Sequence, residues 1–323
     1  MWCPWFKIYD SHANSLQRLD AHPMKLHFYQ LDVFTQTPLA GNPLAVFTDG
    51  DGLSTRQMQA IAREMNLPET VFVQKPTGTR ALARLRIFTT TTELPLAGHP
   101  VIGTWFLLAQ LGVVPAQKGS VHIWQQTGAG ILPVEIAFHD GRPSRITMTQ
   151  KPAQFRTANS LNLDCAALAR ALGLAAGDLD CGGKSGLPVE FVSTGVFNLL
   201  VPLRRQALLA RIESDPRALA RVVGASATMV YCFALGARNT VFARGMLPWA
   251  VAEDAGTGSA AGSLGAYLVR HERLAPATRL DIHQGIEMGR PCRIQVEVLS
   301  ERGKLVPLVS GSAVTILEGF LEI

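Results

Sequence analysis

The sequence predicts an α+β fold with two pseudo-symmetric lobes, each a curved, mostly antiparallel sheet wrapped around a central apolar helix. Two observations favour this fold. Short β-branched segments separated by turn residues recur along most of the 323-residue chain. Each half also contains one apolar helix with almost no polar face, and these helices begin at Gly98 and Gly258. A helix that is apolar all round must be buried, so we expect strands to enclose it.

The first half is expected to contain four strands and two helices. Ser54 is a suitable N-cap for the first helix, and apolar residues at 58, 61, 62 and 65 form one face of it. The second helix is the apolar one, and it runs to about Leu111. The expected strands cover residues 25–34, 44–47, 70–74 and 83–88.

The second half repeats this order of elements. The expected strands cover residues 194–201, 229–235 and 240–243, and the expected helices cover 215–223 and 258–270. Residues 132–154 would link the halves, and residues 280–323 would add strands that complete a sheet.

The domain organisation follows from this repeat. We expect a first lobe at residues 24–145, to which the C-terminal strands could return, and a second lobe at residues 146–323. We expect residues 1–23 to be an irregular, polar leader, because they lack the basic start and apolar run of a signal peptide. Met24 is therefore the expected natural start, unless the leader is a loose tail.

The composition excludes several classes of protein. With 47% hydrophobic and 17% charged residues, the chain can form a core. The net charge of +5 is scattered without a polybasic run, so we expect no nucleic acid partner. The longest apolar stretch, residues 101–114, is too short for a membrane span. The five cysteines form no C-x-x-C pair, so we expect no metal site, and an odd number of free thiols favours a cytoplasmic location.

Both apolar helices begin with small residues, which makes their N-termini candidate anion sites. The first backbone N–H groups of a helix lack internal partners, and the helix dipole is positive there. Gly98-His99 and Gly258-Ser259 would meet in one cleft if the lobes face each other. The acidic side chains expected near that cleft are Glu69, Glu93, Glu253 and Asp254.

These residues also have structural interpretations. The glycines could form simple turns, His99 could be a packing residue, Asp254 could be a cap, and Glu69 could be solvated. The string from Gly256 to Ala261 fits a dinucleotide fingerprint only loosely, because two acidic residues precede it and no strand–turn–helix unit opens the chain.

A series of motifs in both halves resembles the PhzF-like phenazine-biosynthesis family, and the resemblance covers about residues 24–323. The motifs in chain order are Leu31-Asp32-Val33-Phe34, Gly41-Asn42-Pro43, Arg63-Glu64-Met65-Asn66-Leu67-Pro68-Glu69-Thr70, Glu93-Leu94-Pro95-Leu96-Ala97-Gly98-His99-Pro100, Val192-Ser193-Thr194-Gly195, Glu253-Asp254-Ala255-Gly256-Thr257-Gly258-Ser259-Ala260 and Gln284-Gly285-x-x-Met288-Gly289-Arg290-Pro291.

The resemblance implies a diaminopimelate epimerase-like fold, a homodimer and no cofactor. It implies an isomerase that moves a proton between ring carbons of a dihydro-hydroxyanthranilate, a small carboxylated substrate. The resemblance assigns the general acid/base role to Glu69, with assistance from His99, Asp254 and Ser259. We expect Asn42, Gly98 and Gly258, together with Ser259, to bind the substrate.

The sequence departs from the family pattern next to the expected pocket. Pro68 stands where the family usually has serine, Ala255-Gly256 replaces a Pro-Ala pair, and the stretch 244–252 is longer than usual. These departures leave the substrate open, because they border the pocket rather than replace the acid–base groups.

Two other functions remain open at this stage. Amino-acid racemases and epimerases of the same fold place a thiol immediately before each glycine turn, where this chain has Ala97 and Thr257. Neither side chain can deprotonate a carbon. A non-catalytic paralogue that only binds a small molecule is the second alternative.

Overall fold

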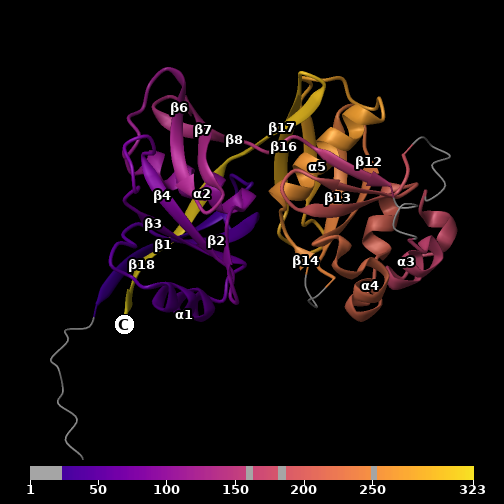
Figure 1. The fold of residues 1–323 in the computed structure, drawn as a ribbon, viewed down its shortest axis with the longest axis horizontal. Coiled ribbons are helices and arrows are strands. Elements are labelled where there is room, and N and C mark those ends of the chain that lie inside the picture. Colours follow the sequence, from indigo (N-terminus) through magenta and orange to yellow (C-terminus); the bar gives the residue numbers. More distant parts are fainter. Residues whose placement is uncertain (1–23, 158–162, 181–186, 249–252) are drawn as a thin grey trace, which may run out of the picture.

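The computed structural model describes residues 24–157, 163–180, 187–248 and 253–323. The leader at residues 1–23 lies outside the described residues. Figure 1 shows two halves side by side, with the first half drawn in indigo to magenta and most of the second in orange. None of the helices in the described part of the chain is long and apolar enough to cross a membrane.

The first half consists of eight strands and two helices in chain order. They are β1 (Lys25–Val33), β2 (Asn42–Phe47), α1 (Thr55–Met65), β3 (Glu69–Gln74), β4 (Ala83–Phe88), β5 (Glu93–Leu94), α2 (Gly98–Gln110), β6 (Gly119–Thr127), β7 (Gly130–His139) and β8 (Arg142–Thr149).

The rest of the described chain contributes three α-helices and ten strands, besides short 3-10 helices. They are β9 (Gln154–Thr157), α3 (Cys165–Ala171), β10 (Glu190–Ser193), β11 (Phe197–Pro202), α4 (Pro216–Val223), β12 (Met229–Leu235), β13 (Thr240–Met246), β14 (Glu253–Asp254), α5 (Gly258–Arg270), β15 (Leu280–Gln284), β16 (Cys292–Glu301), β17 (Lys304–Gly311) and β18 (Ala313–Glu322).

The two halves pair their strands in the same sequence of directions. In the first half, β1–β2 is antiparallel, β2–β3 parallel, β3–β4 antiparallel, β4–β6 parallel, and β6–β7–β8 antiparallel. In the second half, the series β10, β11, β12, β13, β15, β16 and β17 repeats these directions. The α+β class and the predominance of antiparallel pairing are therefore confirmed.

Each half also gives one strand to the other. β9 follows β8 and pairs with β10 of the second half, whereas β18 follows β17 and pairs with β1 of the first half. β8 and β17 pair with each other where the chain crosses. Residues 132–154, predicted as the link, therefore contain most of β7 and all of β8, which pair with strands of the first half. β8 continues past the expected boundary at residue 145.

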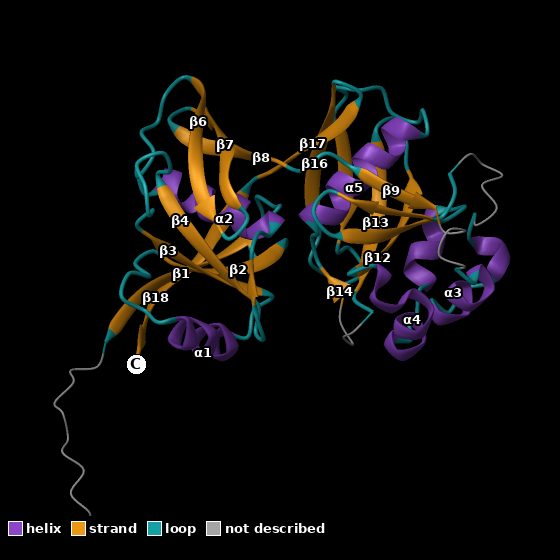
Figure 2. Cartoon of the chain, in the orientation of Figure 1, coloured by secondary structure: helices purple, strands orange, loops and turns teal. Residues whose placement is uncertain are grey.

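The apolar helices α2 and α5 lie among the strands, as Figure 2 shows, whereas α1, α3 and α4 lie outside. α2 packs against β1, β2, β3, β7 and β8, and α5 packs against β10, β11, β16 and β17. Ser54 caps α1 as predicted, and its side chain completes a capping box with Gln57. Most residues of α2 and α5 are buried, so the positions of both helix N-termini are fixed by the core.

The cysteines differ from expectation at one position. Cys232 and Cys292 are free thiols, but Cys165 at the start of α3 is disulfide-bonded. The expectation of free thiols is therefore wrong at Cys165. The cysteine count no longer supports a cytoplasmic location.

Candidate active site

The N-termini of α2 and α5 meet head to head between the two halves. A Cβ atom built on Gly98 would lie 3.0 Å from the Cα of Gly258, and a Cβ on Gly258 would lie 3.1 Å from the Cα of Gly98. A Cβ atom at either position would crowd the opposite backbone, which favours glycine at both positions. The two predicted helix starts are therefore brought to one place, with their positive dipole ends toward the same region.

Glu69 and His99 lie beside this contact, on the side of the first half. Glu69 is the first residue of β3, and His99 is the second residue of α2. Glu69 Oε2 and His99 Nε2 are 3.3 Å apart. Both atoms are buried, and neither has a hydrogen-bond partner among the described residues. Buried polar atoms without a partner are rare, and a catalytic role or a bound water or ion is among their explanations.

Burial shifts the protonation of both groups toward their neutral forms. Burial and, to a smaller extent, the negative charge of Asp254 together raise the pKa of Glu69 to about 8. Burial lowers the pKa of His99 to about 4, against the opposing effects of Asp254 and of a hydrogen bond to the Pro43 backbone. At neutral pH the pair is therefore a carboxylic acid beside a neutral imidazole, not an ion pair.

Asn42 connects the two halves at this place. It is fully buried at the start of β2. Its amide nitrogen Nδ2 lies 2.6 Å from Asp254 Oδ1, 3.0 Å from the Gly256 carbonyl and 3.3 Å from His99 Nδ1. An amide nitrogen has two hydrogens, so the two shorter contacts are the stronger hydrogen bonds. Asn42 thus fixes Asp254 of the second half against the helix that carries His99.

The second half surrounds Asp254 with further donors. Thr257 Oγ1 donates to Asp254 Oδ2 at 2.6 Å. Gln284 Nε2 donates to the Asp254 carbonyl at 2.7 Å and to Thr257 Oγ1 at 3.0 Å. Gln284 Oε1 in turn accepts from the Tyr231 hydroxyl and from the Thr257 N–H. Both carboxylate oxygens of Asp254 are therefore held by hydrogen bonds.

Gln284 and Tyr231 were not predicted as site residues. Gln284 stands in the sequence as a polar residue at the end of a strand and at the head of the last family-like motif. It is fully buried, and a buried amide needs partners. No local pattern singles out Tyr231, because its hydroxyl reaches Gln284 only through the pairing of β12, β13 and β15.

Two of the four candidate acids do not face the site as free carboxylates. Arg86 holds Glu93 with two hydrogen bonds, of 2.8 and 2.6 Å. Arg244 forms an ion pair with Glu253 and also donates to two backbone carbonyls. Ser259 is half-buried, and its carbonyl accepts from Thr194 Oγ1 at 3.3 Å. The structure therefore brings Glu69, His99, Asn42 and Asp254 together, with Gly98 and Gly258 beside them.

Comparison with known protein families shows to which family the chain belongs. The family described as "Phenazine biosynthesis-like protein" matches residues 31–319. The chain belongs to this family. Among its members, a trans-2,3-dihydro-3-hydroxyanthranilate isomerase of Pseudomonas chlororaphis is 36% identical over 295 residues, which are 91% of this chain and 98% of that protein. The protein of the same name from Pseudomonas aeruginosa is 36% identical, over 90% of this chain and 96% of its own length.

Solved structures agree with this membership in the phenazine biosynthesis-like family. The Bacillus anthracis phenazine biosynthesis protein of the PhzF family is 28% identical, with a TM-score of 0.83 over 93% of this chain and all of that chain. A probable proline racemase from Agrobacterium radiobacter has a TM-score of 0.65 over 92% of both chains, but it is only 12% identical. The racemase therefore shares the fold, and the likeness says nothing of shared chemistry.

Proposed function

We propose that the chain is an isomerase that moves a proton between carbon atoms of a small carboxylated ring, with Glu69 as the proton carrier. The observation that carries the proposal is the state of Glu69. Its Oε2 is buried without a hydrogen-bond partner, and its pKa is raised to about 8. Trans-2,3-dihydro-3-hydroxyanthranilate, the substrate named for the relatives at 36% identity, is the substrate to test first.

The proton transfer balances without any other reactant. Glu69 as a carboxylate takes a proton from carbon, and the C–H electron pair passes into the conjugated ring system. The same group, now a carboxylic acid, returns the proton to a second carbon. A pKa of about 8 suits both steps, because the group gains and loses its proton readily near neutral pH. No atoms or electrons are gained overall, which supports a reaction without a cofactor.

The remaining residues have positioning and binding roles in this proposal. The neutral imidazole of His99, 3.3 Å from Glu69, would orient the carboxyl group and the intermediate. The N–H groups at Gly98-His99 and Gly258-Ser259 would bind the substrate carboxylate, because helix N-termini attract anions. Asp254, fixed by Asn42 and Thr257, would face the ring substituents.

The two-base racemase alternative lacks bases at the required positions. Ala97 is the N-cap of α2 and has no titrating group, and Thr257 is the N-cap of α5. The Thr257 hydroxyl is already held between Asp254 and Gln284. We therefore do not propose racemisation.

Three further features stay proposals. The first is a division into lobes of residues 24–145 and 146–323, with β18 returned to the first.

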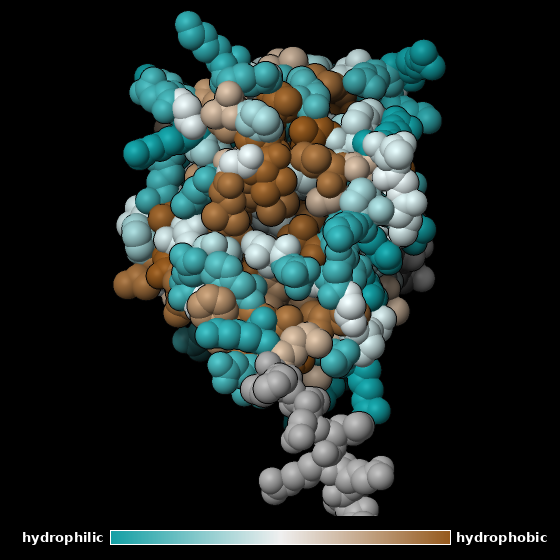
Figure 3. All heavy atoms as spheres, turned by 90° about the vertical axis from the view of Figure 1, so that its left-hand side faces the viewer, coloured by the Kyte–Doolittle hydropathy of each residue, from teal (hydrophilic) through white to brown (hydrophobic). Residues whose placement is uncertain are grey.

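The second is a homodimer. Figure 3 shows apolar side chains gathered on the outer face of the first half, and the exposed large apolar residues of that half include Leu82, Trp124 and Phe320. The third is a cytoplasmic location.

The proposed function is tested by incubating the purified chain with trans-2,3-dihydro-3-hydroxyanthranilate in heavy water and following the ring protons by NMR. We expect isomerisation with deuterium at the carbon that receives the proton. Glu93→Gln is the matched control, because that carboxylate is paired with Arg86, and it should react like the wild type. An inert wild-type chain would favour the non-catalytic paralogue.

A further inference from the structure

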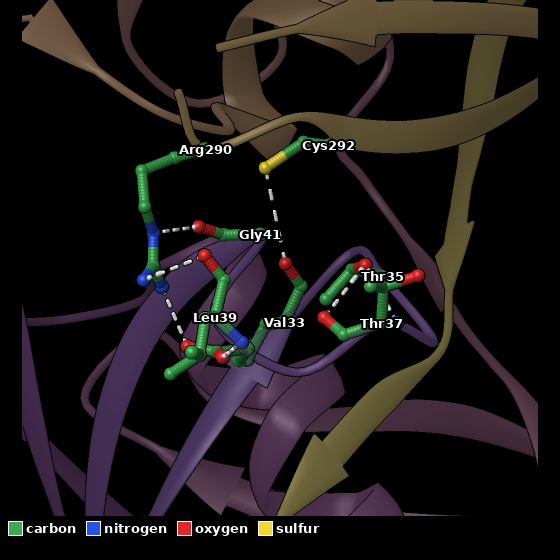
Figure 4. A network of polar contacts seen from close by, with 8 residues as sticks. Val33, Thr35, Thr37, Leu39, Gly41, Arg290 and Cys292 are labelled. Carbon is green, nitrogen blue, oxygen red and sulfur yellow. Dashed lines mark hydrogen bonds and ion pairs between the residues drawn. The ribbon is translucent and has the colours of Figure 1, made fainter. Parts of the chain in front are cut away.

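Arg290, just before β16 in the second half, reaches across to the first half. Figure 4 shows its guanidinium beside the loop that follows β1. Its Nη2 lies 2.5 Å from Oδ1 of Asp32, a carboxylate that is fully buried. Its Nε donates to the Gly41 carbonyl at 2.9 Å, and its Nη1 donates to the Leu39 carbonyl at 3.2 Å. All three guanidinium nitrogens therefore bind one short stretch of the first half.

The loop that Arg290 holds contains an unfavourable backbone conformation. Leu39 has φ of 67° and Gly41 has φ of 72°, so both lie in the left-handed region, which is unfavourable for leucine. Oδ2 of Asp32 accepts from the Leu39 N–H at 2.7 Å, and the Gly41 N–H donates to the Pro291 carbonyl at 3.1 Å. The loop conformation is thus fixed from both halves.

The residue that follows this loop is Asn42, whose amide lies against Asp254 and His99. The backbone carbonyl that Arg290 binds belongs to Gly41, directly before Asn42. A displacement of the backbone at Gly41 would therefore act directly on Asn42, the next residue in the chain. Arg290 itself makes no contact with Glu69, His99 or Asp254 among the interactions of the described residues.

We propose that Arg290, together with Asp32, is a positioning residue that sets the place of Asn42 and through it the relative positions of His99 and Asp254. This proposal rests on the function proposed above. The planar fork of arginine is required, because a lysine ammonium can retain the charge next to Asp32 but cannot also bind both carbonyls in this geometry.

The kinetic test compares Arg290→Lys with Arg293→Lys, using trans-2,3-dihydro-3-hydroxyanthranilate. Arg293 is the matched control, since it lies three residues further on and pairs with Asp281 instead. We expect Arg290→Lys to lower kcat at least about 10-fold, with KM changed less than about 3-fold, and Arg293→Lys to leave both unchanged. In the Asn42→Ala background, Arg290→Lys should have no further effect on kcat, because it acts through Asn42.

The proposal is overturned if Arg290→Lys keeps wild-type kcat, or if it lowers kcat equally with and without Asn42. A purely structural role would lower the melting temperature and leave kcat of the folded fraction unchanged. If Arg290→Lys fails to fold, Asp32→Asn is measured in the same way, because it keeps the size of the buried side chain and removes its charge.

A second measurement needs no substrate, so it separates this proposal from the proposed function. The ¹⁵N shifts of the His99 ring, assigned by comparison with His99→Gln, report on the surroundings of Nδ1. We expect Arg290→Lys to move them and Arg293→Lys to leave them in place. Unmoved His99 shifts in a folded Arg290→Lys variant would refute the positioning role, whereas an inert wild type with moved shifts would refute only the proposed function.

Discussion

The starts of α2 and α5 occupy equivalent places in the two halves but carry different chemistry. At α2, the side chains of Glu69 and His99 have buried polar atoms without hydrogen-bond partners, and both pKa values are shifted. At α5, Asp254 and Thr257 are bound to each other, and Asn42 and Gln284 add further hydrogen bonds. One half therefore holds groups that can exchange a proton, and the other holds groups that are fixed.

This difference explains how a symmetric framework can support a one-base reaction. The repeated strand order places two helix N-termini opposite each other. A reaction with one base on each side of a carbon would need a titrating group at both. Here the second side is occupied by a hydrogen-bonded hydroxyl, so in the proposed reaction a proton that leaves the substrate on the side of Glu69 would return from the same side.

The largest expected effect comes from replacing Glu69, the proposed proton carrier. Glu69→Gln keeps the shape of the side chain but cannot take a proton from carbon. We expect kcat for trans-2,3-dihydro-3-hydroxyanthranilate to fall at least about 100-fold, as is usual for general acid–base groups. In the other half, Thr257→Val should lower kcat less than about 10-fold, because it removes only one donor to Asp254. Equal losses in steady-state assays of the two variants would contradict the unequal roles of the halves.

The backbone contact between the helices provides the next test. Gly98→Ala would place a methyl group 3.0 Å from the Gly258 backbone, which cannot move without shifting α5. We expect a loss of about 1–3 kcal/mol in the free energy of unfolding, the usual cost of overpacking. Gly78→Ala is the matched control, because nothing lies within 4 Å of a Cβ at that position and Gly78 is not among the glycines with positive φ. Urea unfolding of these variants measures the difference, and an unchanged Gly98→Ala stability would show that the helices do not meet.

The pH dependence of kcat/KM gives a third prediction. The pH dependence of kcat/KM reports on the protonation state of the free enzyme. In the proposed reaction Glu69 accepts the first proton as a carboxylate, so kcat/KM should rise with pH, and the midpoint of the rise should lie near pH 8. The negative charge of Asp254 contributes to this high pKa, so Asp254→Asn should move the midpoint to lower pH. A profile that is already flat above pH 6 would mean that Glu69 is ionised in the free enzyme.

The smallest expected effect is on stability. In the unfolded chain Glu69 titrates near 4.5 and in the folded chain near 8, so between these values the folded state holds the extra proton. The contribution of Glu69 to the free energy of unfolding is therefore lost as the pH rises from about 4.5 to about 8. Glutamine does not titrate, so the Glu69→Gln variant loses no stability in this way. The melting temperature of the variant minus that of the wild type should therefore increase by at least about 3 °C from pH 6 to pH 9. Calorimetry at the two pH values checks this.

Much of the fold follows from local patterns in the sequence. The capped helix α1 and the fully apolar helices α2 and α5 were predicted with nearly correct bounds, since their signals lie within a dozen residues. The exchange of β9 and β18 has no local signal in the sequence, because β18 pairs with β1 at the opposite end of the described chain and β9 pairs with β10 across an intervening helix. The strand β6 was missed, since many of its side chains are exposed and its pattern is mixed.

The candidate site can be predicted only in part, because local motifs identify single residues but not the partners that strand pairing brings to them. Glu69, His99, Asp254 and Asn42 come together because each lies at the end of a strand or the start of a helix within a recognisable motif. Glu93 and Glu253 looked equivalent to them in the sequence. Their partners Arg86 and Arg244 lie on β4 and β13, and only the strand pairing brings each arginine next to its acid.

A titration of the Glu69 carboxyl group by ¹³C NMR tests the central claim most directly, because it needs no substrate. The Glu69 signal is assigned by its loss in Glu69→Gln, and its shift is followed from pH 4 to pH 10. The structure predicts a midpoint near pH 8, since burial and Asp254 both disfavour the carboxylate. A midpoint below pH 5, in the range of an ordinary exposed glutamate, would contradict the account of Glu69 as a buried proton carrier.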